Sequence, residues 1–364
     1  MTFIVLTIVG GLSSFSGLLK KFWGIGMLLF LGFLMGEGIS GITPDYILYM
    51  TDYENGTNYF ESGYNLLSSI GRSMGMNYST FRLSISLLSV LILLWAILRL
   101  TTNITVVVFL YAISIFSIDA IQVRNFVMLC LVVLAFSFLR KRGFKNYSLA
   151  AIILLVASSI HTLGFMFFIP YALSFIKLNK QIDLSKMILL FSVVLVFLGY
   201  FFKSFLMKLS ESMLSIFNFR STTVNNVGTV YDNGAGLRYI AVALIISIIQ
   251  FLVVMYISRS IENERFANVT RFILPVAFLG LFAVIMMTVS LDYCRLLRNT
   301  TLFIYVYVAI YFGNQYELKR NNNKQFLSLL FSVILLAALT FFLQDFMLYP
   351  NAGEVYGYTI QYIR

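Results

Sequence analysis

Apolar runs of about 15 to 22 residues recur from one end of the chain to the other, with polar segments between them. A helix needs about 20 apolar residues to cross the hydrocarbon core of a bilayer. Backbone amides in lipid must find partners within their own segment, so runs of this length and number predict helices rather than the alternating strands of a barrel. The pattern therefore predicts an all-α polytopic membrane helical bundle with about 12 transmembrane helices. The predicted spans lie near residues 2–19, 22–37, 81–98, 104–118, 125–139, 147–161, 162–176, 187–206, 237–258, 271–290, 301–313 and 326–346.

The polar remainder of the chain is small. The sequence is 60% hydrophobic, and its mean hydropathy is +0.88. Its longest hydrophilic stretches, about residues 38–80 and 203–236, are too short to form a separate core. We therefore expect a single integral membrane domain over residues 1–364, with these stretches as two larger loops. The second loop begins amphipathic and ends polar, so it forms either an interfacial helix followed by a flap over the site or a plain connection.

The first apolar run, residues 1–19, lacks a basic start and a small-residue cleavage pattern, and Lys20 and Lys21 follow it. We interpret this run as a retained span rather than a cleaved signal peptide. Cys130 and Cys294 lie in or beside apolar runs without partners at metal-ligand spacing. We therefore expect buried thiols, with neither a metal site nor a disulfide framework.

Basic residues gather on one side of the predicted bundle. That side carries Lys20, Lys21, Arg99, Arg140, Lys141, Arg142, Lys145, Lys177, Lys180, Lys186, Arg259, Arg265, Arg271, Lys319, Arg320 and Lys324, sixteen of the 26 Lys and Arg residues. An excess of basic residues marks the cytoplasmic side of a membrane, so the two larger loops are extracytoplasmic. The opposite side holds ten of the 15 acidic residues, and its net charge is near zero. The formal charge of +11 therefore reflects topology and attraction to anionic membrane lipid, and we expect no nucleic acid partner.

Six polar residues from distant parts of the sequence all fall at the outward ends of predicted spans. They are Asp45, Glu61, Arg124, Arg295, Arg298 and His161, the only histidine of the chain. Outward arginines do not help insertion, and a guanidinium at that depth is costly unless it is paired. The partner is either an internal carboxylate, such as Asp119 or Asp292, or an anionic ligand such as a lipid diphosphate, which guanidinium binds bidentately. Taken together, the six residues favour an anion site.

Four stretches of sequence carry a family resemblance: PDYILYMTDYENG, FESGYNLLSSIGRSMGMNYSTF, IDAIQVRNFVML and SSIHTLGFMFFIPYAL. In order and spacing they resemble the EpsG family of Wzy-like polysaccharide polymerases, over about residues 35–310. The later stretch YCRLLRNTTLFIYVYVAI is similar to the arginine-led final portion of that family. The family often has an Arg before its first-loop Asp and a Gln after its mid-chain Arg, whereas this chain has GEGISGITP and Asn125 there. The positions that match the family pattern are Asp45, Tyr46, Tyr49, Glu61, Gly63, Tyr64, Arg124 and His161.

The resemblance implies a glycosyltransferase that joins oligosaccharide repeat units on undecaprenyl diphosphate at the outer face of the bacterial cytoplasmic membrane, for O-antigen, capsule or exopolysaccharide. It implies a lipid-linked glycan donor and acceptor, no cofactor and no metal. A flippase and a chain-length regulator of the same pathway are the implied partners.

Roles for the matching residues follow from that reaction. Arginines stabilise the charge of a leaving diphosphate, and the candidates are Arg124, Arg295 and Arg298. A general base must take the proton of the attacking hydroxyl, and His161 and Asp45 compete for that role. A histidine pKa near 6.5 favours His161 over an aspartate near 4. The remaining substrate-binding candidates are Glu61, Tyr49 and Tyr64.

Each of these residues also has a structural alternative. Asp45 follows a proline and fits a helix N-cap or a turn. Glu61 fits a residue that holds the loop together, and Tyr49 and Tyr64 fit an interfacial aromatic belt.

Rival functions remain open from the sequence. A glycosyltransferase that adds single sugars from a polyprenyl monophosphate would use the same outward acid and arginines. A flippase for lipid-linked oligosaccharides would need charged residues at mid-membrane depth rather than at the outer ends of spans. A membrane O-acyltransferase would need companions that are missing around His161, and a scaffold would not need the outward polar residues.

Overall fold

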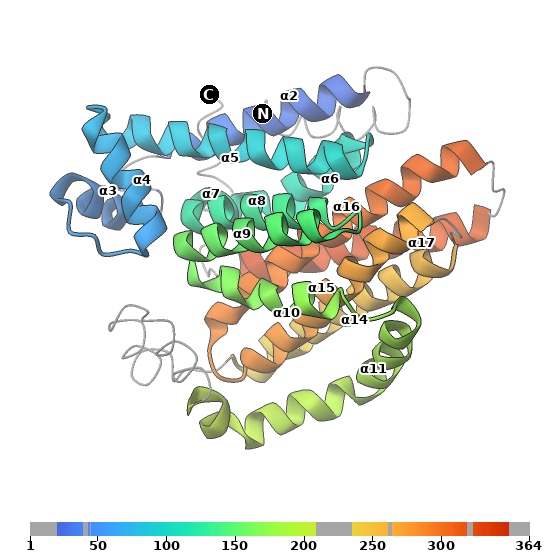
Figure 1. The fold of residues 1–364 in the computed structure, drawn as a ribbon. Helices are drawn as coiled ribbons and strands as arrows, with labels where there is room; N and C mark the ends of the chain where they lie inside the picture. Colours follow the sequence, from blue (N-terminus) through green and yellow to red (C-terminus); the bar gives the residue numbers. More distant parts are fainter. Residues whose placement is uncertain are drawn as a thin grey trace. The chain divides into compact units, whose positions relative to one another are not determined.

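The structure is a computed structural model, and it describes residues 20–38, 43, 45–208, 235–260, 264–318 and 323–348. Within these residues every regular element is helical (Figure 1). The predicted span 2–19 and most of the predicted loop 203–236 lie outside the described residues. The all-α prediction is confirmed for the described part of the chain.

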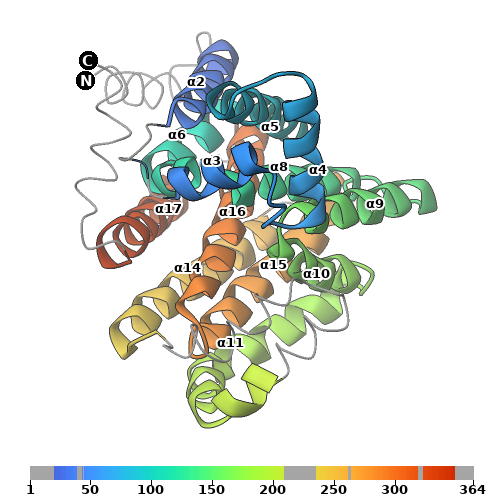
Figure 2. The ribbon, with the colours of Figure 1, turned by 90° about the vertical axis from the view of Figure 1, so that its left-hand side faces the viewer.

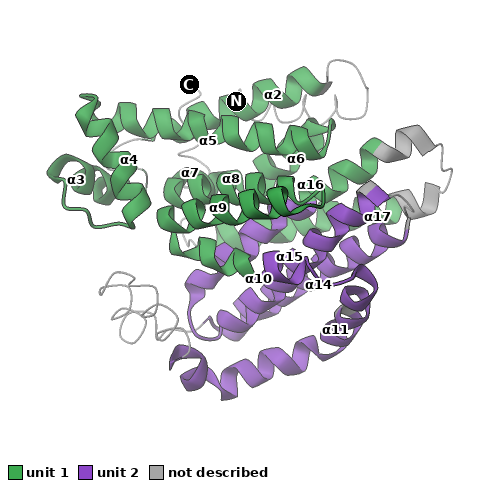
Figure 3. Ribbon diagram, in the orientation of Figure 1, with its two compact units in different colours: residues 1–168, 305–364 green, residues 169–304 purple. Residues whose placement is uncertain are grey.

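The chain divides into two compact units (Figure 3), residues 1–168 with 305–364 and residues 169–304. The helices wholly in the first unit are α2 (Lys20–Gly36), α3 (Tyr46–Asn55), α4 (Ser62–Ser73), α5 (Tyr78–Leu100), α6 (Ile104–Ser114), α7 (Phe116–Ile121), α8 (Val123–Phe138), α9 (Phe144–Ile160), η1 (Thr162–Phe167), α17 (Asn323–Phe341) and η3 (Phe342–Met347). Those wholly in the second are α11 (Leu178–Phe201), α14 (Leu237–Ser260), α15 (Glu264–Met286) and η2 (Leu291–Tyr293). The boundaries between the units fall within α10 (Phe168–Leu173) and α16 (Cys294–Leu318).

Long apolar helices characterise the chain as a multi-pass membrane protein. The described residues contain six helices long and apolar enough to cross a membrane, and five shorter apolar helices. The expected span 162–176 is shorter than predicted: Thr162–Leu173 is an apolar helix that begins as the 3-10 helix η1 and continues directly as α10. Gly164 lets η1 lie close against the end of α9, because a Cβ on this residue would lie 2.8 Å from the Cα of Ser158.

In the first unit α2 packs on α5, α5 on α8, and α8 on α9 (Figures 1 and 2). Two glycines let α2 approach α5 closely. A Cβ on Gly32 would lie 2.7 Å from the side chain of Val90, and a Cβ on Gly36 would lie 2.7 Å from the Cα of Leu83. Small residues four positions apart are a common device for packing helices in membranes.

The expected span 104–118 is divided into two helices, because the backbone leaves helical geometry at Ile115. The short α7 that follows is fully buried and carries Ser117 and Asp119. Ser117 donates a hydrogen bond of 2.5 Å to Asp345 on the π-helix η3, and Tyr111 donates one of 3.2 Å to Asp119. These carboxylates are paired with hydroxyls, as polar groups inside a bundle must be.

Polar side chains also join the helices of the second unit. Gln250 on α14 donates to the hydroxyl of Thr301 on α16 at 2.8 Å and accepts from Thr300 at 3.2 Å. Gln181 on α11 donates to the backbone carbonyls of Leu173 at 2.7 Å and Arg271 at 3.1 Å. Both amides are fully buried and bridge elements that are distant in sequence.

Candidate functional site

The predicted first outer loop folds into two short helices, α3 and α4, around an aromatic cluster. The rings of Tyr49 and Phe60 stack with centroids 4.7 Å apart, and the edge of Tyr64 meets Phe60 at 5.5 Å. Tyr49 is 7% exposed and Tyr64 is 3% exposed. This packing explains why a polar loop becomes helical, since it supplies a small core of its own. Any contact of these two tyrosines with substrate stays a prediction.

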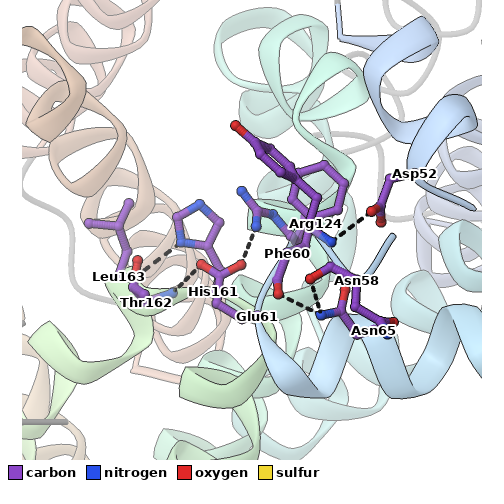
Figure 4. Close-up of polar contacts among 10 residues, drawn as sticks. Asp52, Asn58, Phe60, Glu61, Asn65, Arg124, His161, Thr162 and Leu163 are labelled. Atoms are coloured by element: carbon purple, nitrogen blue, oxygen red, sulfur yellow. Dashed lines mark hydrogen bonds and ion pairs between the residues drawn. The ribbon is translucent and has the colours of Figure 1, made fainter. Parts of the chain in front are cut away.

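Glu61 and Arg124 form an ion pair inside the first unit (Figure 4). Glu61 directly precedes α4, and Arg124 lies in the first turn of α8. The guanidinium also lies over the ring of Phe60, with its Cζ 4.4 Å from the ring centroid. Each of the two charged side chains is only 13% exposed. The surrounding rings limit the motion of Arg124, so the sequence-predicted arginine is held in one orientation.

The same carboxylate reaches the segment that follows α9. Its Oε1 accepts the backbone N–H of Thr162 at 3.2 Å, one residue after His161. Figure 4 shows Glu61, Arg124 and His161 side by side, brought together from three distant parts of the sequence. The structure therefore brings these three predicted residues together, and their roles at a site stay predictions.

His161 is the N-cap residue of η1, and its imidazole is oriented by the backbone. Its Nδ1 accepts the N–H of Leu163 at 3.2 Å. A nitrogen that accepts a hydrogen bond carries no proton, so the proton of the neutral ring is on Nε2. The imidazole therefore presents an N–H donor from Nε2.

A glycine sets the distance between α4 and α9. A Cβ on Gly63 would lie 2.8 Å from the backbone carbonyl of Ser159, which is closer than real side chains approach. Gly63 follows Glu61 by two positions, so this close approach brings the start of α4 to the end of α9. The Glu-x-Gly-aromatic pattern thus has a physical reason at each position: an ion pair, a close backbone approach and a buried ring.

Asp52 organises the turn between α3 and α4, and the sequence alone did not single it out. Its carboxylate is 4% exposed and accepts hydrogen bonds from the hydroxyl of Thr57 and, at 2.7 Å, the N–H of Tyr59. Tyr59 itself is 43% exposed. Its ring meets the edge of Phe60 at 5.3 Å, so it is an exposed aromatic ring next to the Arg124 pair.

Asp45 occupies the N-cap position of α3, as the structural alternative predicted, but its side chain makes no capping hydrogen bond. Its backbone is left-handed, with φ 62°, which Asp tolerates better than most residues. The residue is exposed. Its carboxylate is therefore presented to the surroundings one turn before Tyr49, whose ring centroid lies 6.0 Å from the Cζ of Arg124.

Two of the arginines predicted to be cytoplasmic, Arg99 and Arg140, lie at the other ends of α5 and α8. Arg99 donates to the hydroxyl of Ser137 at 2.9 Å, and Arg140 donates to the backbone carbonyl of Arg99. Arg124 and Arg140 are separated by the length of α8, about 24 Å at 1.5 Å per residue. The first unit thus has one end with the predicted cytoplasmic arginines and another with the Glu61, Arg124 and His161 group.

Arg295 and Arg298 belong to the second unit. Arg295 pairs with Asp292 at 2.9 Å, which is the internal carboxylate that the sequence offered as one alternative. Arg298, one turn further along α16, is 1% exposed. Their convergence with Glu61, Arg124 and His161 stays a prediction.

Arg82 is a further arginine at a predicted outward end, and sequence reasoning missed it. It lies in the first two turns of α5 and is 1% exposed. It donates to the backbone carbonyls of Met35 at 3.1 Å and Ala120 at 2.6 Å. The sequence could have identified Arg82, because it lies at the predicted outward end of the span 81–98, and the same criterion selected Arg124.

Cys130 and Cys294 are buried free thiols, as predicted. Among the described residues no group of three His, Cys, Asp or Glu side chains is close enough to hold a metal ion. Burial raises the pKa of Tyr64 well above its ordinary value, so this phenol stays protonated and is no candidate for a general base. What the group offers chemically is a fixed guanidinium and an imidazole N–H donor, a combination suited to an anionic substrate.

No curated protein and no solved structure matches the chain. A family model does match, over residues 21–359, a longer range than the motifs alone suggested. The chain belongs to the EpsG family, membrane proteins linked to exopolysaccharide biosynthesis.

Proposed function

We propose that this protein is a polymerase that joins oligosaccharide repeat units carried on undecaprenyl diphosphate, at the outer face of the bacterial cytoplasmic membrane. The observation that carries the proposal is the convergence of Glu61, Arg124 and His161, at the end of the first unit away from Arg99 and Arg140, in a member of the EpsG family. The predicted topology makes that end the outward one.

In the proposed reaction a hydroxyl of the acceptor glycan attacks the anomeric carbon at the reducing end of the donor glycan. A glycosidic bond forms, the bond from that carbon to the diphosphate oxygen breaks, and its electron pair leaves with the lipid diphosphate. Arg124 stabilises the negative charge that develops on the leaving oxygen, because its guanidinium is already oriented by Glu61 and Phe60. Arg295 and Arg298 are proposed as further contacts to the diphosphate.

The geometry changes the preference between the two candidate bases. His161 uses Nδ1 to accept the Leu163 N–H, so its neutral ring acts from Nε2 as a hydrogen-bond donor. Asp45 has an exposed carboxylate with no capping role. We therefore assign Asp45 as the base that takes the hydroxyl proton, and His161 as a donor that orients a substrate oxygen.

Exposed aromatic rings are the natural contacts for the apolar faces of sugar rings. Tyr59 is exposed and adjoins Phe60, whereas Tyr49 and Tyr64 are enclosed in the aromatic cluster. Tyr59 is therefore the proposed stacking residue for the glycan. A flippase that delivers the lipid-linked units and a regulator of chain length are the proposed partners.

The test is polymer formation by the purified protein from undecaprenyl-diphosphate-linked repeat units of the native host, observed as a ladder of glycan lengths. We expect a ladder with the wild type, and its loss in Arg124→Gln and Asp45→Asn. Asn accepts the left-handed backbone of position 45, so the second variant should fold normally. Products that grow by one sugar from a polyprenyl monophosphate would instead indicate the single-sugar transferase, and transfer across liposomes without a ladder would indicate a flippase.

Arg99→Gln is the matched control for Arg124→Gln. Arg99 also lies over a phenylalanine ring, with its Cζ 3.9 Å from the centroid of Phe138, but at the opposite end of the helices. We expect this variant to keep the ladder. Equal loss of the ladder in both variants would argue that any buried arginine is needed for folding and that Arg124 has no special role in the chemistry.

A further inference from the structure

Arg82 is a buried cation without a carboxylate partner among the described residues. Its side chain is 1% exposed, and its Nε and Nη2 donate to the carbonyls of Met35 and Ala120. No carboxylate of the described chain lies within 4.0 Å of it. A charged group removed from water needs a neutralising partner, because loss of hydration strongly disfavours an unpaired ion.

The two carbonyls that Arg82 contacts account for only part of its hydrogen-bonding capacity. Both are in the last turns of helices, α2 for Met35 and α7 for Ala120, where carbonyls lack partners within the helix and carry partial negative charge. Nη1 is also buried, and in the described part of the chain it has no hydrogen-bond partner. The two N–H groups of Nη1 therefore remain for a further acceptor.

In the described part of the chain the neighbouring side chains leave Nη1 without an acceptor. The ring of Tyr46 lies under the guanidinium, with its centroid 5.3 Å from Cζ, and the Tyr78 hydroxyl is hydrogen-bonded to the guanidinium. A ring face and a neutral hydroxyl lower the cost of the charge but do not neutralise it. Gly38 completes the enclosure, since a Cβ on this residue would lie 2.8 Å from Cζ of Arg82.

Arg82 and Arg124 are placed on the same side of α3. Tyr46 contacts the first guanidinium, and Tyr49, one helical turn later, lies 6.0 Å from the second. Arg82 also holds the carbonyl of Ala120, four residues before Arg124. One arginine of the two is balanced by Glu61, so the pair as a whole carries an unbalanced positive charge.

We propose that Arg82 is an anion-binding residue whose Nη1 binds a phosphate oxygen of a membrane lipid. Guanidinium and phosphate form strong charge-assisted hydrogen bonds, and enclosure of Nη1 strengthens them by excluding water. Two lipids carry this chemistry: the diphosphate of a polyprenyl-linked donor and the headgroup of an anionic phospholipid. The first source rests on the proposed function, and the second does not.

The experiment measures binding of two phosphate probes to the full-length protein, farnesyl diphosphate and inorganic pyrophosphate, by equilibrium dialysis in detergent. A parallel arm compares thermal unfolding in nanodiscs of phosphatidylcholine with and without phosphatidylglycerol. We expect one of two results for Arg82→Gln, because a charged hydrogen bond is lost. Either its binding of the diphosphate probes weakens about 10- to 100-fold, or phosphatidylglycerol no longer shifts its unfolding temperature. Gln at this position retains an amide donor for the two carbonyls.

Arg72→Gln is the matched control. Arg72 likewise donates to a carbonyl, that of Tyr53 at 2.9 Å, and lies over the Tyr53 ring at 5.6 Å. We expect this variant to bind both probes within about twofold of the wild type, since its role is structural. Should Arg82→Gln fail to fold, Gly38→Ala takes its place, because the added Cβ crowds the guanidinium without removing its charge.

The outcomes separate the inference from the proposed function. Loss of diphosphate binding in Arg82→Gln identifies the lipid diphosphate, and loss of only the phosphatidylglycerol shift identifies a phospholipid headgroup. If Arg82→Gln, or Gly38→Ala in its place, responds to all probes as the wild type does, Arg82 only caps two helices and the inference is overturned. A wild type that binds through Arg82 but forms no glycan ladder would remove the polymerase proposal and leave the anion site standing.

Discussion

Glu61 and Arg124, 63 positions apart in the sequence, form the ion pair that joins the start of α4 to the start of α8. The same carboxylate accepts the N–H of Thr162, beside His161. One side chain therefore connects three segments of the predicted outward end. Its surroundings are mostly buried, so the pair is stronger and less screened by salt than one on a surface.

Removal of Glu61 is expected to destabilise the first unit. Glu61→Ala leaves the Arg124 guanidinium without its carboxylate, at a cost of about 3 kcal/mol for a largely buried pair. Glu61→Gln, which keeps a hydrogen-bond acceptor, should cost less. Thermal unfolding of the purified protein in detergent measures both. An unfolding midpoint of Glu61→Ala equal to that of the wild type would show that the pair contributes little to stability.

Gly63→Ala tests the close packing of α4 on α9. The new Cβ would lie 2.8 Å from the Ser159 carbonyl, so α4 must move away from α9 and take Glu61 with it. We expect a lower unfolding temperature and loss of polymer formation together. Gly26→Ala is the control, because Gly26 is also helical but has no atom within 4 Å of the added Cβ. That control should be neutral or stabilising by up to about 1 kcal/mol, the helix-propensity difference.

The two roles of His161 can be separated by substitution. His161→Asn keeps a side-chain oxygen that accepts the Leu163 N–H, whereas His161→Ala loses the cap at a cost of about 1 kcal/mol. We expect the Asn variant to unfold at the wild-type temperature and the Ala variant to unfold at a lower one. Both should lose polymer formation if the imidazole N–H contacts substrate. Full activity of His161→Asn would limit His161 to its capping role.

The all-α bundle and most of its helices were predictable from hydrophobic run length, because a membrane imposes that length on every span. Residues 104–118 and 162–176 are apolar helices that differ in detail from the predicted spans: the first breaks at Ile115, and the second begins as a 3-10 helix and ends at Leu173. These details depend on packing between segments, such as the close approach at Gly164, and the apolar pattern alone does not encode that packing. Likewise the helices α3 and α4 arise from ring contacts between residues of a polar segment.

The candidate site was predictable as a set of residue types but not as contacts. Topology reasoning brought Glu61, Arg124 and His161 to one side of the membrane, and the structure brings them together. The tautomer of His161 could not be predicted, since it depends on a backbone N–H two residues later. Asp52 was overlooked because its carboxylate acts on the turn that presents Tyr59, and nothing in its sequence position distinguishes it from other loop acids.

The tyrosines of α3, α4 and the segment between them differ in exposure, and this difference predicts which of them binds sugar. Tyr59 is 43% exposed, whereas Tyr64 is 3% exposed, and burial raises the pKa of Tyr64 so that its hydroxyl stays neutral. Tyr59→Ala should raise the acceptor concentration needed for half-maximal polymerisation about tenfold, the loss expected for one aromatic stacking contact of about 1 to 2 kcal/mol. Tyr64→Phe keeps the buried ring and should leave that concentration unchanged. The reverse result, with Tyr64→Phe impaired and Tyr59→Ala normal, would move the sugar contact from the exposed ring to the aromatic cluster.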